Sequence, residues 1–277
     1  MNPDLLIVVY CVLVVAASLF GGWLPSLTRL THTRMQLMIS FVAGLMLGVS
    51  LFHMLPHAAS HIGSLDRAVV WMTIGLLVMF FMIRAFRFHQ HEATGAPAAA
   101  EPHPRGAAHR LSWVGVAVGL SLHTAIDGVA LAASVVARTE GTLFGLGTFV
   151  VVWLHKPLDA LSITSLMTAG GWSRRLCQYV NAGFAMMCPL GAALFYVGVG
   201  GEPGVVVGSA LGFTAGVFLC ISLGDLLPEL QFHAHDRIKL SVALLAGVLL
   251  AWSMTLLEAR GGGHTLAAVP DGVEARR

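Results

Sequence analysis

Long apolar runs separated by short polar connections cover most of this 277-residue chain. A helix needs about 20 mostly apolar residues to cross the hydrocarbon core of a bilayer. Eight stretches meet this length: residues 5–24, 36–56, 68–88, 111–137, 142–169, 176–199, 204–228 and 240–257. The pattern predicts an all-α integral membrane protein with residues 1–277 as a single polytopic membrane domain, whose eight helices occupy about residues 5–257.

The composition supports this class of protein. Hydrophobic residues make up 56% of the chain and charged residues only 11%, whereas a soluble domain carries about 25% charged residues. This low charged fraction makes the bilayer the expected environment. The net charge of +2 is too small to indicate a nucleic-acid partner. The four cysteines form no CxxC motif, which argues against a disulfide framework and against a thiolate metal site.

The distribution of Lys and Arg predicts the orientation. Ten of these residues lie in the connections after the first, third, fifth and seventh predicted helices, and five lie in the other connections and the two ends of the chain. Because positive residues accumulate on the cytoplasmic side, we expect a multi-pass protein of the cell membrane with both termini extracytoplasmic. Residues 258–277 then form an extracytoplasmic tail.

The one long connection, residues 89–110, is expected to be a His-containing cytoplasmic loop. Its histidines lie among Ala, Pro and Gly: His89, His91, His103 and His109. This composition buries little apolar surface and predicts disorder. The segment is either a solvated linker or a low-affinity collector of transition metals, and the sequence leaves both interpretations open.

Two of the predicted helices share a pattern that indicates an internal repeat. Residues 43–57 (AGLMLGVSLFHMLPH) and 215–229 (AGVFLCISLGDLLPE) are identical at seven of fifteen positions. The second and seventh helices cross in opposite directions, which predicts an inverted repeat of the kind found in secondary transporters. Polar residues also match near the shared Leu-Pro pair: His53 with Asp225, and His57 with Glu229. These residues, with His61, either line an entrance or exit or make interhelical hydrogen bonds.

Ionisable residues gather near the middle of the fourth and fifth predicted helices. His123 and Asp127 are four residues apart, as are His155 and Asp159, and Lys156 follows His155. A charged side chain facing lipid at the helix centre costs about 2.5–3.5 kcal/mol, so these groups must face one another, water or an ion.

Positions i and i+4 share one helix face. Two such helices face to face offer two imidazoles and two carboxylates, which is enough for a four-coordinate Zn²⁺ site. The same ligands accept Fe²⁺, Mn²⁺, Co²⁺ or Cd²⁺. Pro157 inside the fifth helix frees a backbone carbonyl, which is tolerated at membrane depth where it lines a cavity. The alternative is that these residues are polar contacts between helices without an ion.

At these residues the chain resembles the ZIP family of divalent metal transporters. HTAIDG at 123–128 resembles the family's fourth-helix motif, and HKPLD at 155–159 resembles its fifth-helix motif in shortened form. The repeated AG…LP segments are also ZIP-like. The resemblance implies a homodimer that carries Zn²⁺ as substrate, without an organic cofactor, between the fourth and fifth helices. It also implies an elevator-like movement of helices 1, 4, 5 and 6 against helices 2, 3, 7 and 8.

The chain departs from the family where some relatives hold a second metal ion. The corresponding positions here are Thr124, Lys156 and Cys188. A second cation beside the lysine would be repelled at low dielectric, so we expect a mononuclear site. Met46 lies where some relatives contribute a thioether, and it is either an additional ligand or a packing residue.

These observations favour a transporter that moves a divalent metal ion, with Zn²⁺ the first expectation, into the cytoplasm through the mononuclear site. One alternative is a zinc-dependent integral-membrane hydrolase, although the HExxH motif of metalloproteases is absent from the sequence. The others are an Fe²⁺- or Mn²⁺-selective carrier of the same fold, and a proton pathway that uses the same side chains without metal.

Overall fold

The computed structural model describes residues 3–27, 32–87, 106–137, 145–199, 204–226 and 237–261. Within these ranges, eight helical spans are long and apolar enough to cross a membrane, which confirms the predicted fold class. The helices are α1 (Pro3–Leu27), α2 (His32–Val49), α3 (Leu55–Ile62), α4 (Leu65–Arg87), α6 (Gly106–Val136), α7 (Leu146–Ala169), α8 (Arg174–Ala185), α9 (Met187–Val199), α10 (Val205–Ile221) and α12 (Arg237–Gly261). Two short π-helices, η1 (Ser50–Met54) and η2 (Ser222–Leu226), continue α2 and α10.

Several boundaries differ from those expected. The second span runs through α2, η1 and α3 to Ile62, and the sixth is divided at Met186 into α8 and α9. Helix α6 begins at Gly106, so residues 106–110 are helical although they were expected in the loop; they include Ala and Arg, which favour helix. Helix α12 extends to Gly261, into the expected tail. The rest of the loop, residues 88–105, and residues 262–277 lie outside the described ranges.

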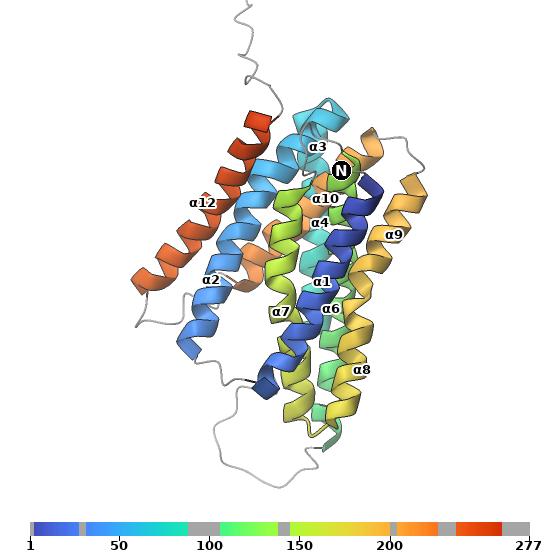
Figure 1. Cartoon of the computed structure of the whole chain (residues 1–277), viewed down its shortest axis with the longest axis vertical. Coiled ribbons are helices and arrows are strands. Elements are labelled where there is room, and N and C mark those ends of the chain that lie inside the picture. The colour runs from blue at the N-terminus through green and yellow to red at the C-terminus, as the bar shows by residue number, and fades with distance from the viewer. Residues whose placement is uncertain are drawn as a thin grey trace, which may run out of the picture.

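The helices pack as two groups. The first half-bundle consists of α1, α6, α7, α8 and α9, with its most extensive contacts between α6 and α9 and between α1 and α7. The second half-bundle consists of α2, α3, α4, α10 and α12, in which α2 packs on α12 and α4 packs on α10. Figure 1 shows α12 and α2 side by side at one edge and α1, α8 and α9 at the other. These groups correspond to the two sets of helices that the family resemblance implied.

Glycines allow the paired helices to approach backbone to backbone. In each of three pairs, a Cβ added to a glycine of either helix would lie 1.8–2.1 Å from a carbonyl oxygen of the other. The pairs are Gly44 with Gly247 (α2 and α12), Gly75 with Gly216 (α4 and α10), and Gly128 with Gly191 (α6 and α9). Such contacts hold helices together in lipid, where apolar side chains gain little by leaving their surroundings.

The inverted repeat is visible in the structure. The π-helices η1 and η2 begin at matching positions of the two repeats, and in the sequence a proline follows each of them at a matching position. The Ser50 hydroxyl donates to the Ala215 carbonyl at 2.7 Å, and the Ser222 hydroxyl donates to the Ala43 carbonyl at 2.8 Å. Because Ala43 corresponds to Ala215 and Ser50 to Ser222, the two bonds are equivalent under the repeat. They join α2 to α10 across its axis.

We predict opposite effects for two glycine substitutions. In Gly216→Ala, the new Cβ would lie 1.8 Å from the Met72 carbonyl oxygen, and such overpacking costs about 3 kcal/mol. Gly183→Ala is the matched control, since its Cβ meets nothing within 4 Å and helix propensity gains about 0.5–1 kcal/mol. Thermal unfolding of detergent-purified protein measures both. Equal melting temperatures for the two variants would contradict the close packing of α4 on α10.

Candidate metal centre

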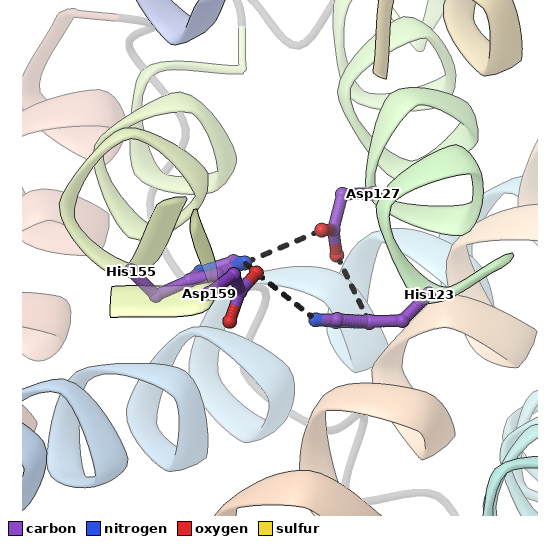
Figure 2. A group of neighbouring side chains, drawn as sticks. All are labelled: His123, Asp127, His155 and Asp159. Atoms are coloured by element: carbon purple, nitrogen blue, oxygen red, sulfur yellow. Dashed lines mark hydrogen bonds and ion pairs between the residues drawn. The ribbon is translucent and has the colours of Figure 1, made fainter. Parts of the chain in front are cut away.

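Two neighbouring helices bring the four predicted ligands together. His123 and Asp127 extend from α6, and His155 and Asp159 extend from α7 towards them (Figure 2). One ligand atom from each residue lies within 4.8 Å of the other three. Consecutive spanning helices run in opposite directions, so the His of each helix lies level with the Asp of the other. The i, i+4 spacing therefore predicted the cluster correctly.

Some of the separations between donor atoms approach those of a tetrahedral site. His155 Nε2 lies 3.3 Å from Asp127 Oδ2 and 3.7 Å from Asp159 Oδ2. His123 Nδ1 lies 3.5 Å from Asp127 Oδ1, and His123 Nε2 lies 3.9 Å from Asp159 Oδ2. Tetrahedral Zn²⁺ with bonds of about 2.0–2.1 Å holds its ligands about 3.3–3.5 Å apart. These separations use both nitrogens of His123 and both oxygens of Asp127; with one donor atom from each residue, all four lie within 4.8 Å of one another. Side-chain movement would therefore be needed to bring four donors to a single ion.

The cluster is shielded on most sides. The side chain of Asp127 is fully buried, both imidazoles are nearly so, and only Asp159 has appreciable exposure, at 16% of its side chain. The edge of the Phe218 ring, from α10, faces the ring of His155 with centroids 6.2 Å apart. The site thus lies where the first half-bundle meets the second and opens beside Asp159.

A backbone contact orients His155. Its Nδ1 lies 2.9 Å from the carbonyl oxygen of Val151, one turn earlier in α7. Because a carbonyl only accepts, Nδ1 is the donor in this contact, and Nε2 faces the two carboxylates, 3.3 Å from Asp127 Oδ2. This arrangement of a ligating histidine is typical of metal sites.

Lys156 supplies a cation at this point. Its Nζ donates to Asp127 Oδ2, to Asp159 Oδ2 at 2.9 Å and to Thr124 Oγ1 at 3.1 Å, and it lies 3.2 Å from His155 Nε2. It also lies 5.8 Å from the centroid of the Phe184 ring. A regular helix would direct residue 156 about 100° away from residue 155, but the long side chain still reaches the cluster beside Pro157.

Close backbone packing fixes the two helices that carry the site. Gly128 follows Asp127 and faces α9, as described above. On the other side, a Cβ at Gly21 of α1 would lie 2.3 Å from Pro157. The hydroxyls of Ser134 and Thr148 share a hydrogen bond of 2.7 Å between α6 and α7. The ligands therefore extend from a rigid support.

The remaining candidate residues are distributed as follows. Met46 and Cys188 are buried in the hydrophobic core, and Cys188 is outside the four-residue group found among the described residues. The His53 ring is buried and makes an edge contact with the His57 ring, with centroids 4.7 Å apart. Asp225 lies in η2, where only the backbone is described, and Glu229 lies outside the described ranges.

Comparison with known proteins identifies relatives of this chain. A family profile described as "ZIP Zinc transporter" matches residues 88–255, which include all four clustered residues. The chain is 30% identical over 174 residues to "Zinc transporter ZIP9-B" of Xenopus laevis, covering 61% of this chain and 54% of that protein. It is 32% identical over 153 residues to "Zinc transporter ZIP6" of Pongo abelii, covering 53% of this chain and 20% of that protein. The chain thus spans about half the length of the ZIP9 relative and a fifth of the ZIP6 relative.

We predict that Zn²⁺ stabilises the purified protein, because four donors on a rigid support bind the ion in the folded state only. At a free Zn²⁺ concentration of 100 times the dissociation constant, the gain is about 2.7 kcal/mol. His155→Ala, which removes one donor, should lose most of this thermal shift. Mg²⁺ is the control, since it prefers six oxygen ligands and should leave the melting temperature unchanged. An equal Zn²⁺ shift in the variant would show that the ion binds elsewhere.

Proposed function

The chain belongs to the ZIP zinc transporter family, and from this membership we propose that it carries a divalent transition-metal ion, Zn²⁺ by expectation, across the cell membrane. His123, Asp127, His155 and Asp159 are the proposed transport site. The observation that carries the proposal is the buried cluster of two imidazoles and two carboxylates in the middle of the membrane span.

The chemistry of the cluster suits a substrate that must be released. Two carboxylates neutralise the charge of a divalent ion, and two neutral imidazoles add affinity without adding charge. Oxygen and nitrogen donors also leave out the thiolates that hold structural zinc tightly. The ligands thus favour reversible binding of a divalent transition-metal ion.

The exposed edge of the cluster supports a direction of transport. Helix α7 starts at the predicted extracytoplasmic side, so Asp159, which follows His155, lies nearer the cytoplasm. The partial exposure of Asp159 supports the proposal that the ion leaves past this residue towards the cytoplasm. Movement of the first half-bundle against the second, as in an elevator, would expose the cluster to the opposite side. A homodimer is the proposed assembly.

The proposed site holds a single ion. The Lys156 ammonium contacts both carboxylates and Thr124, so a second divalent ion at the positions of Thr124, Lys156 and Cys188 would meet a fixed positive charge. Met46 is assigned to packing, because it is buried among apolar side chains.

Membership of a transporter family counts against the membrane-hydrolase alternative. An Fe²⁺- or Mn²⁺-selective carrier would use the same four donors, and competition between metals during uptake separates it from a zinc carrier. A metal-free proton pathway predicts proton flux without metal uptake.

We predict that Asp127→Ala and Asp159→Ala each reduce Zn²⁺ uptake into proteoliposomes at least about tenfold, as expected when a metal ligand is removed. The control is Asp66→Ala, the same change at an exposed aspartate in the first turn of α4. Membrane insertion and elution on size exclusion are measured alongside. Normal uptake by both cluster variants would refute the site assignment.

A second prediction concerns stoichiometry. Equilibrium dialysis followed by elemental analysis should find one central ion per protomer in the wild type. Lys156→Asp replaces the ammonium by a third carboxylate, so it should gain capacity for a second ion and release both more slowly. Two tightly bound central ions in the wild type would contradict the mononuclear proposal.

A further inference from the structure

Lys156 is among the largest fully buried side chains in the described part of the chain. A buried lysine that merely stabilised the fold would need one carboxylate. Here the ammonium contacts the carboxylates of both Asp127 and Asp159 and lies 3.2 Å from Nε2 of His155. These are three of the four residues proposed to hold the ion, so the ammonium lies where a cation bound by them would lie.

We propose that Lys156 is a tethered cation that takes the place of the metal in the empty carrier, so that the ammonium and the ion alternate at the two aspartates. This inference rests on the proposed transport function and adds how the carrier returns without substrate. The lysine remains charged throughout; what changes is its contact with the aspartates.

Formal charges show what the lysine achieves. With neutral histidines, two carboxylates and one ammonium give the empty cluster a charge of −1, and a bound divalent ion changes it to +1. Without the lysine the corresponding charges are −2 and 0. The cost of holding a charge at low dielectric grows with its square, so removing the lysine makes the empty cluster about fourfold more costly to bury. With the lysine, the cluster carries a single charge both when the carrier returns empty (−1) and when it moves with its ion (+1).

The surroundings of the ammonium offer it a second position. Thr124 accepts a hydrogen bond from Nζ, and the face of Phe184 lies within cation–π distance. Neither group belongs to the four proposed ligands. When a divalent ion draws the two carboxylates to itself, these contacts keep the ammonium in the wall of the site rather than in lipid.

The test measures the return of the empty carrier separately from the movement of the carrier with its ion. Net Zn²⁺ uptake into metal-free proteoliposomes requires return of the empty carrier, whereas exchange of external labelled Zn²⁺ for internal Zn²⁺ does not. Lys156→Met should retain exchange, because the loaded cluster becomes neutral, but should lower net uptake at least about tenfold, because two uncompensated carboxylates must cross. Its dissociation constant for Zn²⁺ should fall at least about tenfold, since nothing competes for the aspartates.

Two further variants make the result specific. Lys156→Arg keeps the charge and should retain the wild-type ratio of net uptake to exchange. Thr164→Val changes a buried polar residue of the same helix that bonds only to the backbone of α7, and it should behave as the wild type. If Lys156→Met does not elute as a folded protein, Lys156→Gln takes its place as the neutral variant.

The outcomes distinguish this inference from the proposed function. If the wild type transports Zn²⁺ and the neutral variant has the wild-type ratio and affinity, the tethered-cation role is wrong and transport stands. If a folded neutral variant loses binding and exchange together, Lys156 supports the ligands rather than replacing the ion, and the inference is again wrong. If the wild type moves no metal in either assay, the proposed function itself fails.

Discussion

The cost of keeping charge away from water governs this structure. Two carboxylates lie among apolar helices, where two like charges 4 Å apart repel by about 4 kcal/mol even at an effective dielectric constant of 20. Lys156 offsets that repulsion from within the same helix turn as His155, whose ring is held by the Val151 carbonyl with Nε2 3.2 Å from the ammonium. Helix packing, burial and ligand orientation at the site are all arranged around this one compensated cluster.

The two half-bundles place the cluster where it can change its surroundings. Within each half, glycines bring helix backbones into direct contact, so the helices of a half behave as one unit. Between the halves, His155 and Phe218 form an edge contact, and the buried apolar side chains of both halves belong to one hydrophobic core. The second half-bundle is itself held by the equivalent bonds of Ser50 and Ser222.

The sequence predicted the membrane spans and the clustered side chains, and there are physical reasons why it did not predict the remaining features. Hydropathy predicted the spans because each must be apolar over the bilayer thickness, and the i, i+4 spacing predicted the cluster because it fixes a common helix face. The division at Met186 and the π-helices were not predicted, since one extra residue in a turn barely changes an apolar pattern. Phe184 beside Lys156 was missed for another reason: an aromatic residue in an apolar helix carries no signal of its partner, and only the packing of α8 on α7 reveals it.

The pairing of the helices bears on how the chain is made. Gly44 of α2 meets Gly247 of α12, which is synthesised 203 residues later. At a translation rate of about 5–20 residues per second, the interval is about 10–40 s. During that time α2 is already inserted by its hydropathy, but its small-residue face has only lipid or a foreign helix to pack against. A ribosome that stalls before α12 therefore leaves in the bilayer a helix with an unfilled glycine face, which invites association with other membrane proteins or removal by quality control.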